Sequence, residues 1–117
     1  MLRSRPTRRS FVDQVRAAAA EELTKNTAGQ ASVSRRLGMS TATLRRRLDQ
    51  VHGTRYSEVV DQLRREVAAK HLVESKLRIE EISQRAGFAQ PAPFYRAFKR
   101  WFGCTPAEYR RAYRSGR

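Results

Sequence analysis

The chain has 117 residues, enough for one domain or for two half-domains that share an element, because half-domains of about 50 residues build only marginal cores alone. It carries 25 Lys and Arg against 11 Asp and Glu, and this formal net charge of +14 favours a polyanionic partner, most commonly nucleic acid, over a merely soluble surface. The single cysteine, Cys104, excludes an intramolecular disulfide and suits a reducing cytoplasm, and no apolar run approaches the roughly 20 residues that span a bilayer.

The N-terminal residues 1–10 contain four Arg, one Pro and no acidic residue, so we expect a disordered basic arm or a linker. They hold no apolar stretch, and no secretory signal is expected. A helix is predicted from Phe11 to about Lys25, ended by the glycine-containing segment from Asn26 to Gln30. Its apolar residues recur at steps of three and four: Val12, Val15, Ala19 and Leu23.

Two shorter helices are predicted next, on either side of a glycine turn. The first covers about Ser32 to Leu37, and Gly38 turns the chain because glycine adopts a positive φ at little cost. Ser40 is predicted to cap the second helix, which runs to about His52 and stops at Gly53. Its inward-facing residues are expected to be Leu44, Leu48 and Val51.

The longest predicted helix covers about Ser57 to Ser75 and would be about 28 Å long. One apolar stripe is expected, formed by Tyr56, Val59, Val60, Leu63 and Val67. The other faces carry mixed charges suited to solvent: Asp61, Arg64, Arg65, Glu66 and Lys70. We expect this helix to link the two halves of the chain.

Three helices are predicted after the long one. A short helix covers about Ile79 to Ala86, Gly87 turns the chain, and a longer helix runs from about Pro91 to Phe102. Thr105 is predicted to cap the last helix, which runs from Pro106 to about Tyr113. No segment alternates as a strand would, so the predicted fold is all-α, with about seven helices.

The two glycine turns lie in matching sequences. Val33–Gly38 reads VSRRLG and Ile82–Gly87 reads ISQRAG, so three of six positions are identical. In each, a small serine would let two helices approach, and an apolar residue six or seven positions after the glycine would hold the second helix on the first. This is the helix-turn-helix plan, whose second helix enters a DNA major groove. The predicted organisation is a first unit at about 11–53, a linker helix at about 56–75 and a second unit at about 78–114.

Over about residues 11–113, these motifs resemble the AraC/XylS family of bacterial transcription regulators. The strongest stretches are Ile82–Phe88, Phe94–Gly103 and Thr105–Arg110, and Leu37–Ser40 with Leu44–Arg46 is also similar. The chain departs from the family at Ser34 and Ser83, where alanine is usual, and at Pro93, where a polar residue is usual. The resemblance implies a seven-helix domain whose two recognition helices, the second helix of each unit, read successive major grooves. It also implies RNA polymerase as a candidate partner, and an effector-binding or dimerisation domain N-terminal to this region that this chain does not contain.

The outward faces of the two recognition helices carry the candidate DNA contacts. Arginine is favoured for base contact because its guanidinium can bond guanine O6 and N7 together, whereas a phosphate contact positions the protein without specifying sequence. The candidates for base contact are Ala42, Arg45, Arg46, Pro91, Ala92, Tyr95 and Arg96. The candidates for contact with the DNA backbone are Ser40, Thr41, Arg47, Lys99 and Arg100. The alternative for Arg45 and Arg46 is phosphate contact.

The remaining patterns favour no other chemistry. The aromatic residues at helical spacing are interpreted as core rather than as a base-stacking platform: Phe88, Phe94, Phe98, Trp101 and Phe102. His52 and His71 lack metal-ligand spacing, and no catalytic constellation or cofactor motif is found. The leading hypothesis is therefore a sequence-specific regulator of double-stranded DNA in the cytoplasm at the nucleoid, not an enzyme and not a membrane protein. The alternative is a sequence-tolerant nucleic-acid packaging or RNA-binding protein driven by charge.

Overall fold

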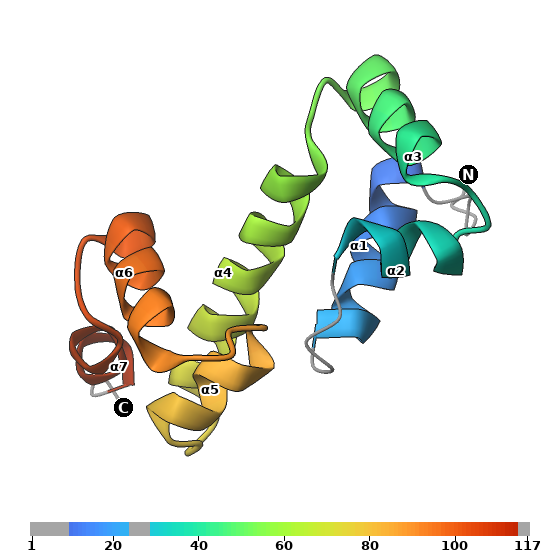
Figure 1. Cartoon of the computed structure of the whole chain (residues 1–117). Coiled ribbons are helices and arrows are strands. Elements are labelled where there is room, and N and C mark those ends of the chain that lie inside the picture. Colours follow the sequence, from blue (N-terminus) through green and yellow to red (C-terminus); the bar gives the residue numbers. More distant parts are fainter. Residues whose placement is uncertain (1–9, 24–28, 115–117) are drawn as a thin grey trace, which may run out of the picture.

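The computed structural model describes residues 10–23 and 29–114, and in these ranges it is helical without a strand (Figure 1). The helices are α1 (Phe11–Leu23), α2 (Gln30–Arg36), α3 (Thr41–Arg47), α4 (Tyr56–Glu74), α5 (Ile79–Arg85), α6 (Pro91–Phe102) and α7 (Pro106–Arg114), with a π-helical segment η1 (Leu48–His52) continuing α3. The all-α prediction is confirmed. None of these helices combines the length and apolar composition needed to cross a membrane. The basic arm expected at residues 1–9 and the end expected for the first helix fall outside the described ranges.

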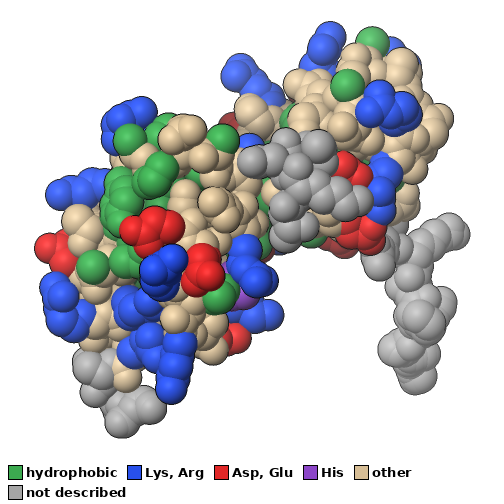
Figure 2. All heavy atoms as spheres, turned by 60° about the horizontal axis from the view of Figure 1, so that its bottom comes forward, with side chains coloured by type: hydrophobic (Ala, Val, Ile, Leu, Met, Phe, Trp, Pro, Cys, Tyr) green, Lys and Arg blue, Asp and Glu red, His purple; other side chains and the backbone are tan. Residues whose placement is uncertain are grey.

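Two lobes share α4, which crosses the middle of Figure 1. The first core lies between α1, α2, α3, η1 and the first half of α4, and the second core lies between the second half of α4 and α5, α6 and α7. Val67 packs against both cores. The radius of gyration is 16.1 Å, whereas a single globule of this length would have about 13 Å. The expectation that the two halves share an element is confirmed, and Figure 2 shows the two lobes with a narrower waist between them.

The shared helix α4 has two buried faces rather than one. The predicted stripe faces the first core through Tyr56, Val59, Val60 and Leu63. A second face, which sequence reasoning missed, buries Ala68 and Leu72 completely in the second core. Asp61 and Arg64 continue this second face toward the N-terminus at helical steps of three and four. The expectation that the charged residues of this helix face solvent was wrong for Asp61, Arg64 and Arg65, which are half-buried, whereas it holds for Glu66 and Lys70.

The two glycine turns have the same geometry, which confirms the internal repeat as a structural one. In each turn the residue after the glycine donates its backbone N–H to the carbonyl of the buried serine: Met39 to Ser34 at 2.9 Å, and Phe88 to Ser83 at 3.0 Å. The glycines have φ values of +74° at Gly38 and +92° at Gly87, a region that side chains disfavour. The second turn is one residue longer before the next helix begins.

Both predicted N-caps are present. The Ser40 hydroxyl accepts the backbone N–H of Thr43 at 3.1 Å. The Thr105 hydroxyl accepts the N–H of Glu108 at 3.1 Å, and the Glu108 carboxylate accepts the N–H of Thr105 at 2.9 Å. The hydrogen bonds from the Thr105 backbone and hydroxyl hold the pKa of Glu108 below its ordinary value. These caps fix where α3 and α7 begin.

Val51 was expected to face inward, and this prediction was wrong, since its side chain is 60% exposed. The cause is η1, whose wider π-helical turn moves Val51 off the line that Leu44 and Leu48 follow. The end of η1 is held instead by His52, whose Nε2 accepts the backbone N–H of Val12 in α1 at 3.1 Å. This bond requires His52 Nε2 to be unprotonated, because only an unprotonated ring nitrogen accepts.

Candidate nucleic-acid interface

In the first unit, α3 is fixed on the core by Leu44, which like Leu48 just after the helix is completely buried. Because these two residues point inward, the opposite side of α3 is exposed. Arg46 lies near the middle of that side, two residues from each leucine, or about 200° around the helix from either. Ala42 and Arg45 are also exposed. The fold thus presents all three predicted base-contact residues of α3 to solvent.

In the second unit, α6 is fixed by Phe94 and Phe98, both completely buried. The predicted base-contact residues of this helix are all exposed: Pro91, Ala92, Tyr95 and Arg96. Tyr95 is 37% exposed, and its ring lies edge-on to Phe94 with 5.9 Å between centroids. Arg96 stands between Phe94 and Phe98 as Arg46 stands between Leu44 and Leu48, so the repeat places an arginine at the same point of both helices.

The residues predicted to contact the DNA backbone differ in whether their side chains already make bonds within the protein. Lys99 and Arg100 are exposed in the last turn of α6. Ser40 and Thr41 lie at the start of α3, where the Ser40 hydroxyl is already used as a cap. The Arg47 guanidinium lies 4.1 Å from the centroid of the Phe11 ring, a cation–π contact with α1 that the sequence did not reveal. Contact of these residues with phosphate stays a prediction.

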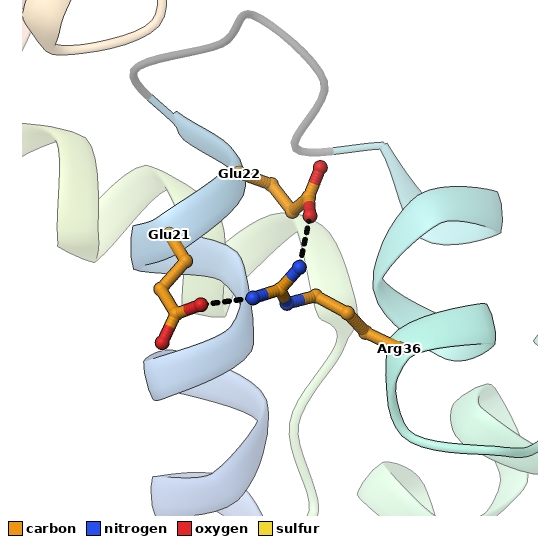
Figure 3. Close-up of polar contacts among 3 residues, drawn as sticks. All are labelled: Glu21, Glu22 and Arg36. Atoms are coloured by element: carbon orange, nitrogen blue, oxygen red, sulfur yellow. Dashed lines mark hydrogen bonds and ion pairs between the residues drawn. The ribbon is translucent and has the colours of Figure 1, made fainter.

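Several other cationic side chains bond acceptors within the protein itself. Figure 3 shows Arg36 of α2 reaching between Glu21 and Glu22 of α1, with 2.9 Å from Nη1 to the Glu22 carboxylate. Arg110 of α7 donates to the carbonyls of Leu72 and Ser75 at 3.1 and 3.2 Å, and thereby caps the end of α4. Burial lowers the pKa of Arg110. The count of 25 Lys and Arg therefore overstates the cations that are free to bind a polyanion, although Figure 2 shows Lys and Arg on both lobes.

A hollow of about 340 Å³ lies beside α3, where the chain enters α4. Arg45 and Asp49 line it from α3 and η1, and Tyr56 and Ser57 line it from α4. Burial raises the pKa of Tyr56 to about 12. Within residues 10–23 and 29–114, no group of three or more His, Cys, Asp or Glu side chains could hold a metal ion.

Comparison with known proteins relates this geometry to proteins that contain helix-turn-helix domains. The family model described as a helix-turn-helix domain matches residues 33–112. The chain is 38% identical over 79 residues to the ornithine utilization regulator of Pseudomonas aeruginosa, an alignment that covers 68% of this chain and 23% of that protein. It is 38% identical over 72 residues to the RCS-specific HTH-type transcriptional activator RclR of Escherichia coli, which covers 62% of this chain and 25% of RclR. The chain thus spans about a quarter of the length of these curated relatives.

Solved structures agree over nearly the whole chain. The C-terminal domain of AraT, a response regulator from Geobacillus stearothermophilus, superposes with a TM-score of 0.78 at 30% identity, covering 91% of this chain and 88% of that one. The DNA-binding domain of AdpA, solved in complex with a target DNA, gives a TM-score of 0.75 at 29% identity and covers 93% of this chain and 97% of that one.

Proposed function

Because the chain belongs to the AraC-type helix-turn-helix family of transcription regulators, we propose that it binds double-stranded DNA in a sequence-specific way, with α3 and α6 in successive major grooves. One observation carries this proposal: the same helix-turn-helix geometry occurs twice on the shared helix α4, with an exposed arginine at the same point of each recognition helix. At 19 residues α4 is about 28 Å long, comparable with the roughly 34 Å of one DNA turn.

The relatives support a regulator over a packaging protein. The AdpA domain was solved with a target DNA, one relative is named as a regulator of ornithine utilization, and RclR is named as a transcriptional activator. The sequence-tolerant packaging or RNA-binding alternative is not favoured. For the whole protein we further propose action at the nucleoid, RNA polymerase as a protein partner, and cooperation with an effector-binding or dimerisation domain, since the matched region is about a quarter of the relatives' length.

Selection of bound sequences from a random duplex library tests the proposal directly. The expected result is a bipartite site with two half-sites about 10 bp apart, centre to centre. Competition at a fixed salt concentration then gives the ratio of specific to non-specific affinity, which for specific binders is typically about 10³ or more. A ratio near one would instead identify a sequence-tolerant binder and overturn the proposal.

Arg46→Ala should cost about 1–3 kcal/mol of binding free energy on the selected site and relax the preference at one base pair. The reason is its exposed position at the centre of the outward face of α3. Lys99→Ala is the matched comparison, because the loss of a phosphate contact should weaken binding to cognate and random duplexes equally. Titration of both duplexes with both variants decides between the roles. An equal loss on the two duplexes for Arg46→Ala would make it a phosphate contact.

The two half-sites should differ in how sharply they are specified. The first recognition helix offers Arg45 and Arg46, whereas α6 begins with Pro91, Ala92 and Pro93, which are exposed and bring no side-chain hydrogen bond. Its first turn offers only apolar contact, for which thymine methyl groups are the natural partner. We therefore expect a guanine-rich preference under α3 and a looser, thymine-rich half under α6 that depends more on DNA shape. Equal information content in both halves of the selected logo would contradict this asymmetry without affecting the bipartite site.

A further inference from the structure

The turn of the second unit touches the first unit directly. In Figure 1 the loop after α5 reaches toward the C-terminal end of α1. A Cβ atom placed on Gly87 would lie 2.8 Å from Cδ1 and 3.2 Å from Cγ of Leu23, whose side chain is 1% exposed. The two units therefore meet at a point where no side chain fits. Gly38, the equivalent glycine of the first unit, has nothing within 4 Å of the same position.

Arg64 of α4 closes this contact from the side. A Cβ atom placed on Gly87 would lie 3.4 Å from the Nε of Arg64. Its guanidinium carbon lies 5.0 Å from the centroid of the Phe88 ring, which in turn meets Phe94 of α6 edge-on at 5.5 Å. The Arg64 Nε is buried, and none of the described residues accepts a hydrogen bond from it. A buried donor without an acceptor lowers the stability of the fold. Packing against Phe88 and Gly87, and not a hydrogen bond, therefore holds this nitrogen in place.

A hydrogen bond supports the same arrangement one turn earlier on α4. The Trp101 indole N–H donates to the Asp61 carboxylate at 3.0 Å and so ties the end of α6 to the linker helix. On the other lobe, Arg16 of α1 pairs with Glu66 of α4. The linker helix is thus fastened to α1 on one side and to the second recognition helix on the other, and the contact between Leu23 and Gly87 joins the two lobes without passing through α4.

We propose that Leu23, Arg64 and Gly87 form a junction that fixes the second unit at one angle to the first, and thereby selects the separation and rotational phase of the half-sites that the chain binds. The proposal rests on the proposed DNA-binding function. One added base pair rotates a half-site by about 35° around the DNA axis. A rigid junction therefore admits one spacing, whereas a loose one would tolerate several at lower affinity, because binding through the second unit depends on geometry. These are positioning residues, since none lies on an outward face of a recognition helix.

The junction can be measured without DNA. In a Cys104→Ser background, Ala20→Cys and Ala112→Cys place spin labels on exposed positions of α1 and α7, one in each lobe. The distance between the labels should show a single narrow distribution. Gly87→Ala should broaden or shift that distribution, because its Cβ displaces Leu23 or Arg64. Gly38→Ala is the matched control, since it introduces the same substitution at a positive φ where the new atom meets nothing.

Binding is then measured on duplexes carrying the selected half-sites with the separation changed in steps of one base pair. The original chain should bind one separation best. Gly87→Ala should lose about tenfold or more at that separation and show a flatter or displaced optimum, whereas Gly38→Ala should lose affinity by one factor at all separations. Arg64→Lys keeps the charge and removes the planar group over Phe88, so it should flatten the optimum even if Gly87→Ala does not fold.

The outcomes separate this proposal from the one beneath it. Selection that yields no bipartite site overturns the proposed function, and the label distances still judge the junction. A bipartite site with the same optimum and the same narrow label distance in Gly87→Ala and Arg64→Lys overturns the junction and leaves the function intact. An optimum that Gly38→Ala alters as much as Gly87→Ala also overturns it, because the effect would then come from backbone strain.

Discussion

Phe98→Ala should unfold the second unit, with a loss of about 3–5 kcal/mol in the free energy of unfolding. The Phe98 ring is completely buried at the centre of an aromatic cluster. Its centroid lies 4.7 Å from Phe102, 5.4 Å from Tyr109, 5.9 Å from Phe94 and 6.4 Å from Trp101. Removing it leaves a cavity and removes aromatic pairs within α6 and between α6 and α7 in one small core. A loss of this size is a large fraction of the roughly 5–15 kcal/mol that stabilises a typical domain.

Trp101 makes the measurement specific to one lobe, because it is the only tryptophan and belongs to the second core. Denaturant unfolding followed by its fluorescence reports the second unit, and circular dichroism at the same time reports all helices. Leu48→Ala is the matched variant, since Leu48 is the equivalent buried residue of the first unit. It should reduce helicity while the Trp101 emission stays that of a half-buried indole. A Phe98→Ala chain within about 1 kcal/mol of the original would contradict the aromatic cluster as the basis of the second core.

Affinity for DNA should fall about 10³- to 10⁴-fold between 50 and 200 mM salt, which corresponds to roughly 5–8 phosphate contacts at a log–log slope of about −0.9 for each. The cations expected to make them are exposed on the recognition helices or next to them. The net charge of +14 does not set the slope, because cations such as Arg36 and Arg110 already bond protein oxygens. Fluorescence anisotropy titrations of a labelled duplex at several NaCl concentrations measure the slope.

Charge variants provide the control for that slope. Lys99→Gln and Arg100→Gln should each reduce its magnitude by about 0.9. Arg36→Gln removes the same charge from a side chain that is paired with Glu21 and Glu22 in Figure 3, so it should leave the slope unchanged. A nearly flat salt response of the original chain would rule out DNA binding altogether, because a polyanionic partner must release counterions when it is bound.

Local signals predicted most of the helices. Periodic apolar residues, the glycines at 38 and 87, and the capping residues Ser40 and Thr105 placed the described helix ends within two residues of those observed. These features act over a few residues, so they can be read along the chain. Val51 shows where such reasoning ends. A π-helical turn changes the spacing of a buried face, and the hydrogen bond from Val12 to His52 that holds its end joins residues 40 positions apart.

The sequence alone could not show which arginines are free to bind a partner and which pack against the protein itself. Arg46, Arg47 and Arg64 look equivalent as letters, yet the first is exposed, the second stacks on Phe11 and the third lies against Phe88. The difference comes from tertiary contacts between segments far apart in the chain. The predicted exposure of the base-contact residues followed from the buried leucines and phenylalanines on the same helices, but their contact with bases stays a prediction until a site is selected.

The shared helix α4 has a consequence for how such a chain can change over time. Each residue inserted into a helix turns everything beyond it by about 100° and advances it by about 1.5 Å. An insertion in α4 between Asp61 and Ala68 would therefore rotate the second recognition helix out of register with the first, even if both cores survived. Loops in this chain can gain or lose residues singly, as the extra residue in the second glycine turn illustrates. The length of α4 cannot change by single residues in this way. A tolerated insertion or deletion would have to comprise about one whole helical turn, and every DNA site that the chain binds would then need a new spacing between its half-sites.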